Sequence, residues 1–180
     1  MNRNTQHVAL CGIFGALALL VMLAGDLLPL AVYLCPALAG LLILPVAYEA
    51  GRRTGWLFYI GISLLSLLLL PDREPAVLFV AFLGYYPLVK ATLEKITCRP
   101  LRWLVKLALF NGTVLAAYYA MLHLFGFAGL AEDFAGMTGG LWATLLALAN
   151  LTFALYDVAV ARLGMVYLTV LRPRIQKGRR

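Results

Sequence analysis

The residues best placed to do chemistry are polar side chains that interrupt long apolar runs in the second half of the chain. Asn150 and Asp157 interrupt one run, and Asn111, Tyr118 and His123 interrupt another. Lipid makes such side chains costly, so they mark bonds between helices, a ligand site or a relay. The corresponding chemistry is hydrogen bonding to a small molecule, or proton or ion coupling at Asp157.

Helical spacing places the polar residues of the last run on one stripe with small residues. The stripe consists of Ala143, Ala147, Asn150, Asp157 and Ala161. A stripe of small and polar side chains faces other helices rather than lipid. In the preceding run, Asn111 and Tyr118 share one helical face, and Tyr119 and His123 share the next.

A group of aromatic and hydrogen-bonding residues is expected toward the outer face of these two adjacent helices. We predict that it binds a small molecule, and it comprises Tyr118, Tyr119, His123, Trp142 and Asn150. Apolar walls with a few polar anchors are usual for small-molecule sites. In the alternative, Asn150 bonds a neighbouring backbone carbonyl while the aromatic rings line the membrane interface. Asn111 is expected nearer the cytoplasm.

Asp157 and Arg162 are expected near the inner end of the last run. Five residues separate them, so they form a poor intrahelical ion pair. In one interpretation Arg162 snorkels, and Asp157 is solvated or bonded between helices. In the other, Asp157 belongs to a proton or coupling relay. Asn111 and Asp157 are therefore the candidate intramembrane polar residues.

Composition assigns the elements that carry these residues to a membrane. Of the 180 residues, 63% are hydrophobic and 13% are charged, whereas soluble domains carry about 25% charged residues. We predict one all-α integral membrane domain over residues 1–180, a six-transmembrane-helix bundle with both termini cytoplasmic. The predicted spans are 8–24, 30–48, 54–71, 75–89, 104–126 and 140–160, the last with room to extend to 171.

The basic residues support this topology. Every Lys and Arg except Arg73 and Arg162 falls in a segment predicted to be cytoplasmic, with Lys106 at the inner end of the span 104–126, as the positive-inside rule requires. The short span 75–89 is kept because a re-entrant loop there would put the later loops on the wrong side. The tail 172–180 is interpreted as an orientation signal that touches anionic lipid, or else as a docking segment for a partner. This distribution does not suit nucleic-acid binding.

The sequence contains no recognisable catalytic or metal-binding motif. Cys11, Cys35 and Cys98 lack metal-ligand spacing, and there is no nucleotide-binding loop, HExxH or GxSxG. We therefore expect no enzyme activity, metal or cofactor. The apolar N-terminus is interpreted as an uncleaved first span. The second span contains three prolines, Pro29, Pro36 and Pro45. We therefore expect residues 25–36 to form an interrupted helical segment that dips into the outer leaflet.

Two segments resemble a known family. LCGIFGALALL in the first span and YLCPALAGLLILP in the second, with the size and topology, resemble the substrate-binding S components of energy-coupling factor (ECF) transporters. The resemblance implies capture of a vitamin or other micronutrient at the outer face of the plasma membrane. It also implies a coupling membrane subunit and two cytoplasmic ATPases as partners. Gly12 and Ala16 stand where the family's first helix carries the Ala-x-x-x-Ala motif that meets the coupling subunit.

Two alternatives remain open. The chain also resembles, in size and topology, the six-span scaffold MreD of a membrane complex, and it could be a self-sufficient small permease. A scaffold predicts that the side chains of Asn150, Tyr118 and Tyr119 pack together and leave no cavity. An S component predicts an outward cavity and a bare small-residue face on the first span, whereas a permease predicts a path that gives Asp157 a role.

Overall fold

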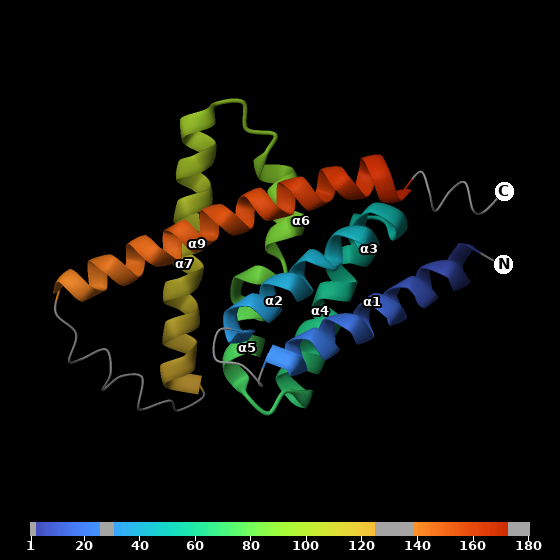
Figure 1. The fold of residues 1–180 in the computed structure, drawn as a ribbon, viewed down its shortest axis with the longest axis horizontal. Helices are drawn as coiled ribbons and strands as arrows, with labels where there is room; N and C mark the ends of the chain where they lie inside the picture. The colour runs from blue at the N-terminus through green and yellow to red at the C-terminus, as the bar shows by residue number, and fades with distance from the viewer. Residues whose placement is uncertain (1–2, 26–30, 125–138, 173–180) are drawn as a thin grey trace.

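The regular structure is entirely helical in the part of the chain that the computed structural model describes, residues 3–25, 31–124 and 139–172 (Figure 1). The elements are α1 (Arg3–Gly25), α2 (Ala31–Leu41), α3 (Ile43–Ala50), α4 (Arg52–Leu69), α5 (Arg73–Leu78), η1 (Phe79–Leu83), α6 (Tyr86–Leu93), α7 (Arg99–Leu124), α9 (Gly139–Val166) and η2 (Tyr167–Leu171). The prediction of an all-α protein is confirmed for these residues.

Five helical stretches are long and apolar enough to cross a membrane. They are Thr5–Gly25, Ala31–Ala50, Arg73–Leu93, Arg99–Ala120 and Gly139–Val170. They correspond to five of the six predicted spans. The remaining predicted span, 54–71, coincides with α4, which has 18 residues and begins with Arg52 and Arg53. These two arginines lower the hydropathy of a helix that is already near the minimum spanning length.

The second span breaks at a different place from the one expected. Residues 31–36, expected in an interrupted segment, are helical, and Pro36 is buried inside α2; residues 26–30 lie outside the described residues. The break falls at Leu42, between α2 and α3. A proline ring clashes with the carbonyl four residues before it, so Pro45 disturbs the helix at Leu41 and Leu42.

The fourth span is longer than its apolar run suggests. The π-helical η1 joins α5 to α6, so the helical stretch covers the 21 residues Arg73–Leu93. At its start, the Asp72 carboxylate accepts a hydrogen bond from the Glu74 N–H at 3.1 Å. At its end, Lys90 belongs to the last turn of α6. The helix therefore includes charged residues at which the sequence prediction stopped.

The core has two parts. The first lies among α1, α2, α3, α4, α5 and the start of η1, where Met22, Ile43, Val46 and Phe79 are completely buried. The second is largely aromatic and lies where η1, α6, α7 and α9 meet. Its closest ring pairs, each with centroids 4.8 Å apart, are Phe82–Tyr86 and Phe110–Phe153.

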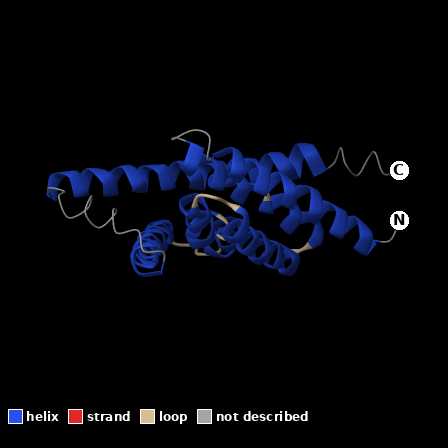
Figure 2. Cartoon of the chain, turned by 90° about the horizontal axis from the view of Figure 1, so that it is seen from below, coloured by secondary structure: helices blue, strands red, loops and turns tan. Residues whose placement is uncertain are grey.

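α7 and α9 lie across each other rather than side by side (Figures 1 and 2). They meet at the stacked rings of Phe110 and Phe153. Beyond this crossing, residues 139–148 of α9 are all exposed. Large apolar side chains are also exposed elsewhere, for example Leu68 on α4 and Val8 on α1, at 78% and 72%. Such a surface suits contact with lipid.

Polar contacts join segments that the sequence assigns to the same side of the membrane. On the predicted outer side, the Tyr33 hydroxyl donates to the Glu74 carboxylate at 2.9 Å. On the predicted inner side, the Arg52 guanidinium donates to the Thr92 hydroxyl at 2.7 Å. Also on that side, Arg172 Nε lies 3.4 Å from a Glu49 carboxylate oxygen.

Candidate functional site

A buried ionic cluster joins α6, α7 and α9 at Asp157. The Nζ atoms of Lys90 and Lys106 donate to Asp157 Oδ1 at 2.7 and 2.8 Å. The Tyr86 hydroxyl donates to the same oxygen, and Lys90 Nζ also donates to the Asp157 backbone carbonyl. Asp157 is 6% exposed and each lysine is 3% exposed. Asp157 is therefore bonded between helices.

Helical spacing explains how α6 supplies two of these groups. Tyr86 and Lys90 are four residues apart, so both side chains lie on one face of α6. Glu94 follows after four more residues, and its carboxylate lies 3.5 Å from Lys90 Nζ at a half-exposed position. Ammonium groups are tolerated in such surroundings only when they are paired and hydrogen-bonded.

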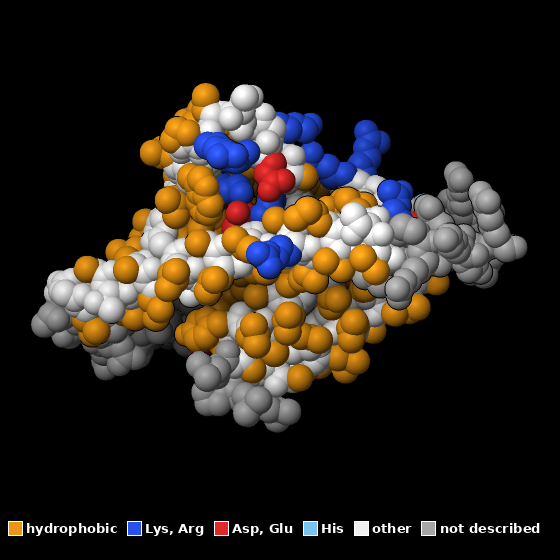
Figure 3. All heavy atoms as spheres, turned by 45° about the horizontal axis from the view of Figure 1, so that its top comes forward, with side chains coloured by type: hydrophobic (Ala, Val, Ile, Leu, Met, Phe, Trp, Pro, Cys, Tyr) orange, Lys and Arg blue, Asp and Glu red, His pale blue; other side chains and the backbone are white. Residues whose placement is uncertain are grey.

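A cavity of about 520 Å³ opens beside the cluster. Its walls come from the end of α6, the start of α7 and the last third of α9, and consist of Lys90, Glu94, Arg102, Trp103, Lys106, Asp157, Val158, Ala161, Arg162 and Met165. Figure 3 shows Lys and Arg side chains gathered around Asp and Glu side chains in a hollow on this face. The lining carries four cationic and two acidic side chains.

Two asparagines meet at the crossing of α7 and α9. Asn111 Nδ2 donates to Asn150 Oδ1 at 3.0 Å, and Asn150 Nδ2 donates back at 3.3 Å. Each amide also donates to the backbone carbonyl four residues earlier, to Leu107 at 2.9 Å and to Leu146 at 2.8 Å. Asn150 thus bonds Asn111 as well as a carbonyl of its own helix.

The aromatic members of the predicted substrate group lie beyond this crossing. Tyr118 and Tyr119 are on α7 and Trp142 is on α9, and Tyr119 and Trp142 are 65% and 38% exposed. His123 belongs to α7, but its side chain lies outside the described residues. None of these residues lines the cavity beside Asp157, nor does any of them line the apolar cavity among α1, α2, α3, α9 and η2. Its role in binding stays a prediction.

The small residues of α1 divide between two faces. Gly15 faces the core, where an added Cβ would lie 3.2 Å from Ile62 Cδ1. Gly12 and Ala16 are exposed, and a Cβ at Gly12 would meet nothing within 4 Å. The face that the sequence assigns to a partner is therefore bare in the isolated chain.

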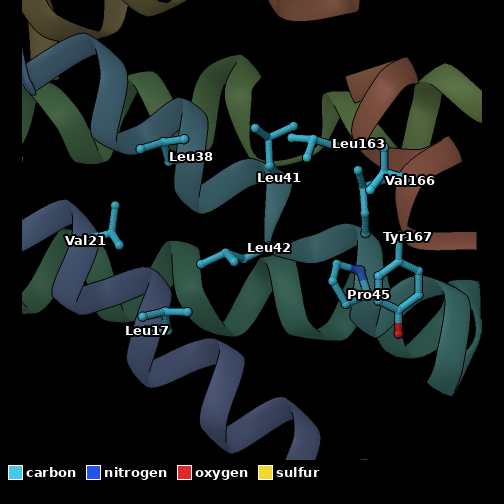
Figure 4. Close-up of a pocket in the computed structure, with 10 residues that line it drawn as sticks. Leu17, Val21, Leu38, Leu41, Leu42, Pro45, Leu163, Val166 and Tyr167 are labelled. Atoms are coloured by element: carbon cyan, nitrogen blue, oxygen red, sulfur yellow. The ribbon is translucent and has the colours of Figure 1, made fainter. Parts of the chain in front are cut away.

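A second cavity, of about 270 Å³, is apolar. α1, α2, α3, α9 and η2 contribute its walls, which consist of Leu17, Val21, Leu38, Leu41, Leu42, Leu44, Pro45, Leu163, Val166 and Tyr167 (Figure 4). The Tyr167 hydroxyl donates to a Glu49 carboxylate oxygen at 3.4 Å. Aliphatic walls can hold an acyl chain, but they offer few groups that could orient a polar micronutrient.

Sequence reasoning missed the partners of Asp157. Lys90 and Lys106 were counted as orientation signals of an inner loop, whereas both are buried against α9. The four-residue spacing of Tyr86, Lys90 and Glu94 was the available signal. Across the described residues, no group of three His, Cys, Asp or Glu side chains could hold a metal ion.

Comparison with known proteins identifies no relative, because no family model, curated protein or solved structure matches the chain. Function is therefore inferred from the residues and their geometry.

Proposed function

We propose that this chain is the substrate-capture subunit of an ECF-type micronutrient uptake transporter. It resides in the plasma membrane and associates with a coupling membrane subunit and cytoplasmic ATPases. The observation that carries the proposal is the bare face of α1 at Gly12 and Ala16. Small residues four apart let another helix approach closely. The neighbouring face of α1 is already packed within the chain, through Gly15, Ala18 and Met22.

The proposed topology has six crossings with both termini in the cytoplasm. α4 is the sixth span, because its two ends lie beside segments assigned to opposite sides. Its first residue, Arg52, bonds Thr92 of the inner loop. Near its last residue, the Leu67 carbonyl accepts from Arg73 of the outer loop. Positive charge on the inner segments orients the whole chain.

The proposed substrate group comprises Tyr118, Tyr119, His123, Trp142 and Asn150, on α7 and α9. The contacts between these helices follow one antiparallel register: Lys106 with Asp157, Phe110 with Phe153, and Asn111 with Asn150. If the same register continued toward the outer ends of the two helices, Tyr118 and Tyr119 would face Trp142. Because α7 and α9 lie across each other in Figure 1, the proposal requires the two helices to align more closely in the bilayer, where spanning helices tilt by about 20° on average.

Purification from the native membrane in mild detergent, with mass spectrometry of what co-purifies, tests the proposal. We expect a coupling membrane protein, ATPase subunits and a retained small molecule. The variant carrying Gly12→Leu and Ala16→Leu should lose the protein partners, because the added side chains block close helix approach. Ala24→Leu, also on the exposed surface of α1, is the matched control and should keep them.

A non-transporting scaffold of the MreD kind is the second candidate. The reciprocal bonds between Asn111 and Asn150 favour it, because they occupy polar groups that a substrate would need. Co-purification of cell-envelope enzymes or cytoskeletal proteins, without a small molecule, would support the scaffold and overturn the transporter proposal.

A further inference from the structure

The cavity beside Asp157 carries more positive charge than its own carboxylates neutralise. Asp157 and Glu94 balance Lys90 and Lys106, with which they form ion pairs. The other two cations in the lining are Arg102 and Arg162. Among the residues that the structure describes, neither guanidinium makes an ion pair. The wall therefore has a net charge of +2.

We propose that this cavity binds a phosphate group, carried either by an anionic lipid or by a soluble phosphate compound. A guanidinium offers paired N–H donors that match phosphate oxygens, and two guanidiniums face this cavity from α7 and α9. At the buried end, Lys106 Nζ has three N–H donors, and the described contacts use one of them, on Asp157. A volume of about 520 Å³ is within the usual range for small-ligand sites.

The rest of the wall suits a ligand with an apolar part. Trp103, Val158, Ala161 and Met165 complete the lining. Met165 and Val158 are 62% and 46% exposed, so the cavity opens onto the apolar surface of α9. Trp103 is 40% exposed and lies against Lys106, whose Nζ is 5.5 Å from the ring centroid. Tryptophan beside basic residues is typical of the boundary between lipid and water.

The shape favours a phosphate group over an acidic segment of a partner protein. The lysines and Asp157 lie at the buried end of a concave site, where a compact anion can approach them but a folded chain cannot. Arg102 is half-buried and Arg162 is exposed, so both guanidiniums are more accessible than the two lysines. A phosphate placed between the two guanidiniums would complete the charge balance of the cavity without disturbing Asp157.

Native mass spectrometry of the purified full chain tests the proposal with three probes. These are phosphatidylglycerol, phosphatidylcholine and inorganic phosphate. The test variant carries Arg102→Gln and Arg162→Gln, and the matched control carries Arg53→Gln and Arg99→Gln, which are exposed, predicted to be cytoplasmic and outside the cavity. Both variants lose the same charge. Thermal unfolding checks that both are folded, and it should change little because these arginines make no ion pairs.

We expect phosphatidylglycerol to bind more tightly than phosphatidylcholine. Affinity should fall by about 100-fold in the test variant, since two charge-assisted contacts are lost, and by about twofold or less in the control. If inorganic phosphate binds saturably to the unmodified protein but not to the test variant, the site is assigned to soluble phosphate compounds. If inorganic phosphate does not bind, the site is assigned to lipid.

Equal affinities of the two variants for every probe would overturn the proposal. So would loss of a co-purified acidic protein from the test variant with phosphatidylglycerol binding unchanged, because the arginines would then serve a protein partner. Neither result bears on the bare face of α1, so the transporter proposal is tested separately.

Discussion

At the scale of single residues, Asp157 balances two ammonium groups that lie almost out of solvent. Lys90 has additional acceptors in the Asp157 carbonyl and in Glu94, whereas the described contacts of Lys106 Nζ with an acceptor are limited to Asp157. Removing one partner of a buried ion pair leaves a charge that the interior cannot solvate. Asp157 therefore has a structural role in holding α7 and α6 against α9.

Asp157→Asn should destabilise the protein by about 3–5 kcal/mol, as seen when one member of a buried pair is removed. The measurement is thermal or denaturant unfolding of the protein in detergent. Glu94→Gln is the matched control, because this carboxylate is half exposed, and it should cost less than about 1 kcal/mol. Adding Lys106→Met to Asp157→Asn should recover part of the loss. A folded Asp157→Asn protein as stable as Glu94→Gln would instead favour a relay role for Asp157.

The asparagine pair allows a separate measurement. Unfolding of Asn111→Leu, Asn150→Leu and the double variant forms a double-mutant cycle. We expect a coupling free energy of about 0.6 kcal/mol, the average for hydrogen bonds between membrane helices. Each single variant should lose more stability than this coupling free energy, because the remaining amide is left without its partner. Additive effects would mean that the two side chains do not interact in the bilayer.

At the scale of elements, a glycine sets how closely α2 approaches η1 and α9. A Cβ at Gly40 would lie 2.2 Å from the Leu83 carbonyl oxygen and 2.6 Å from the Tyr156 hydroxyl. That hydroxyl donates to the same Leu83 carbonyl at 2.7 Å, so the contact joins three elements. Backbone and a bonded tyrosine have little freedom to shift.

Gly40→Ala should therefore destabilise the protein by about 1–3 kcal/mol through overpacking. Gly61→Ala in α4 is the control, because a Cβ there would meet nothing within 4 Å. The control should be neutral or stabilising by up to about 1 kcal/mol, since alanine favours helix more than glycine does. Unfolding in detergent measures both. Equal effects at the two sites would show that this crossing tolerates a methyl group.

At the scale of the whole molecule, polar contacts agree with the proposed orientation, in which both termini are cytoplasmic. The Arg52–Thr92 bond, the Glu49–Arg172 pair and the ionic cluster all lie in segments assigned to the cytoplasm or at the inner ends of predicted spans. If any one of the four predicted spans from 54–71 to 140–160 did not cross, the members of at least one of these pairs would fall on opposite sides.

Cysteine labelling tests this topology in intact cells. In a background with Cys11→Ala and Cys35→Ala, the exposed Cys98 should react with an impermeant maleimide only after the cells are permeabilised. Asp72→Cys with Cys98→Ala should react in intact cells, because residue 72 lies in the predicted outer loop. Labelling of both sites from the same side would contradict a crossing by the stretch Arg73–Leu93, which lies between them.

The sequence by itself determined the helical class and the five apolar helices, because hydropathy is a local property that needs no partner. The four-residue spacing that puts Tyr86 and Lys90 on one helical face is also local, but the predicted span ended at residue 89 and left Lys90 outside the helix. Tertiary structure decided which helix that face meets. Asp157 lies 67 residues from Lys90 and 51 from Lys106, and a formal charge count looks the same whether a lysine faces water or a carboxylate. Burial and pairing depend on how α6, α7 and α9 pack, and only the folded chain specifies that packing.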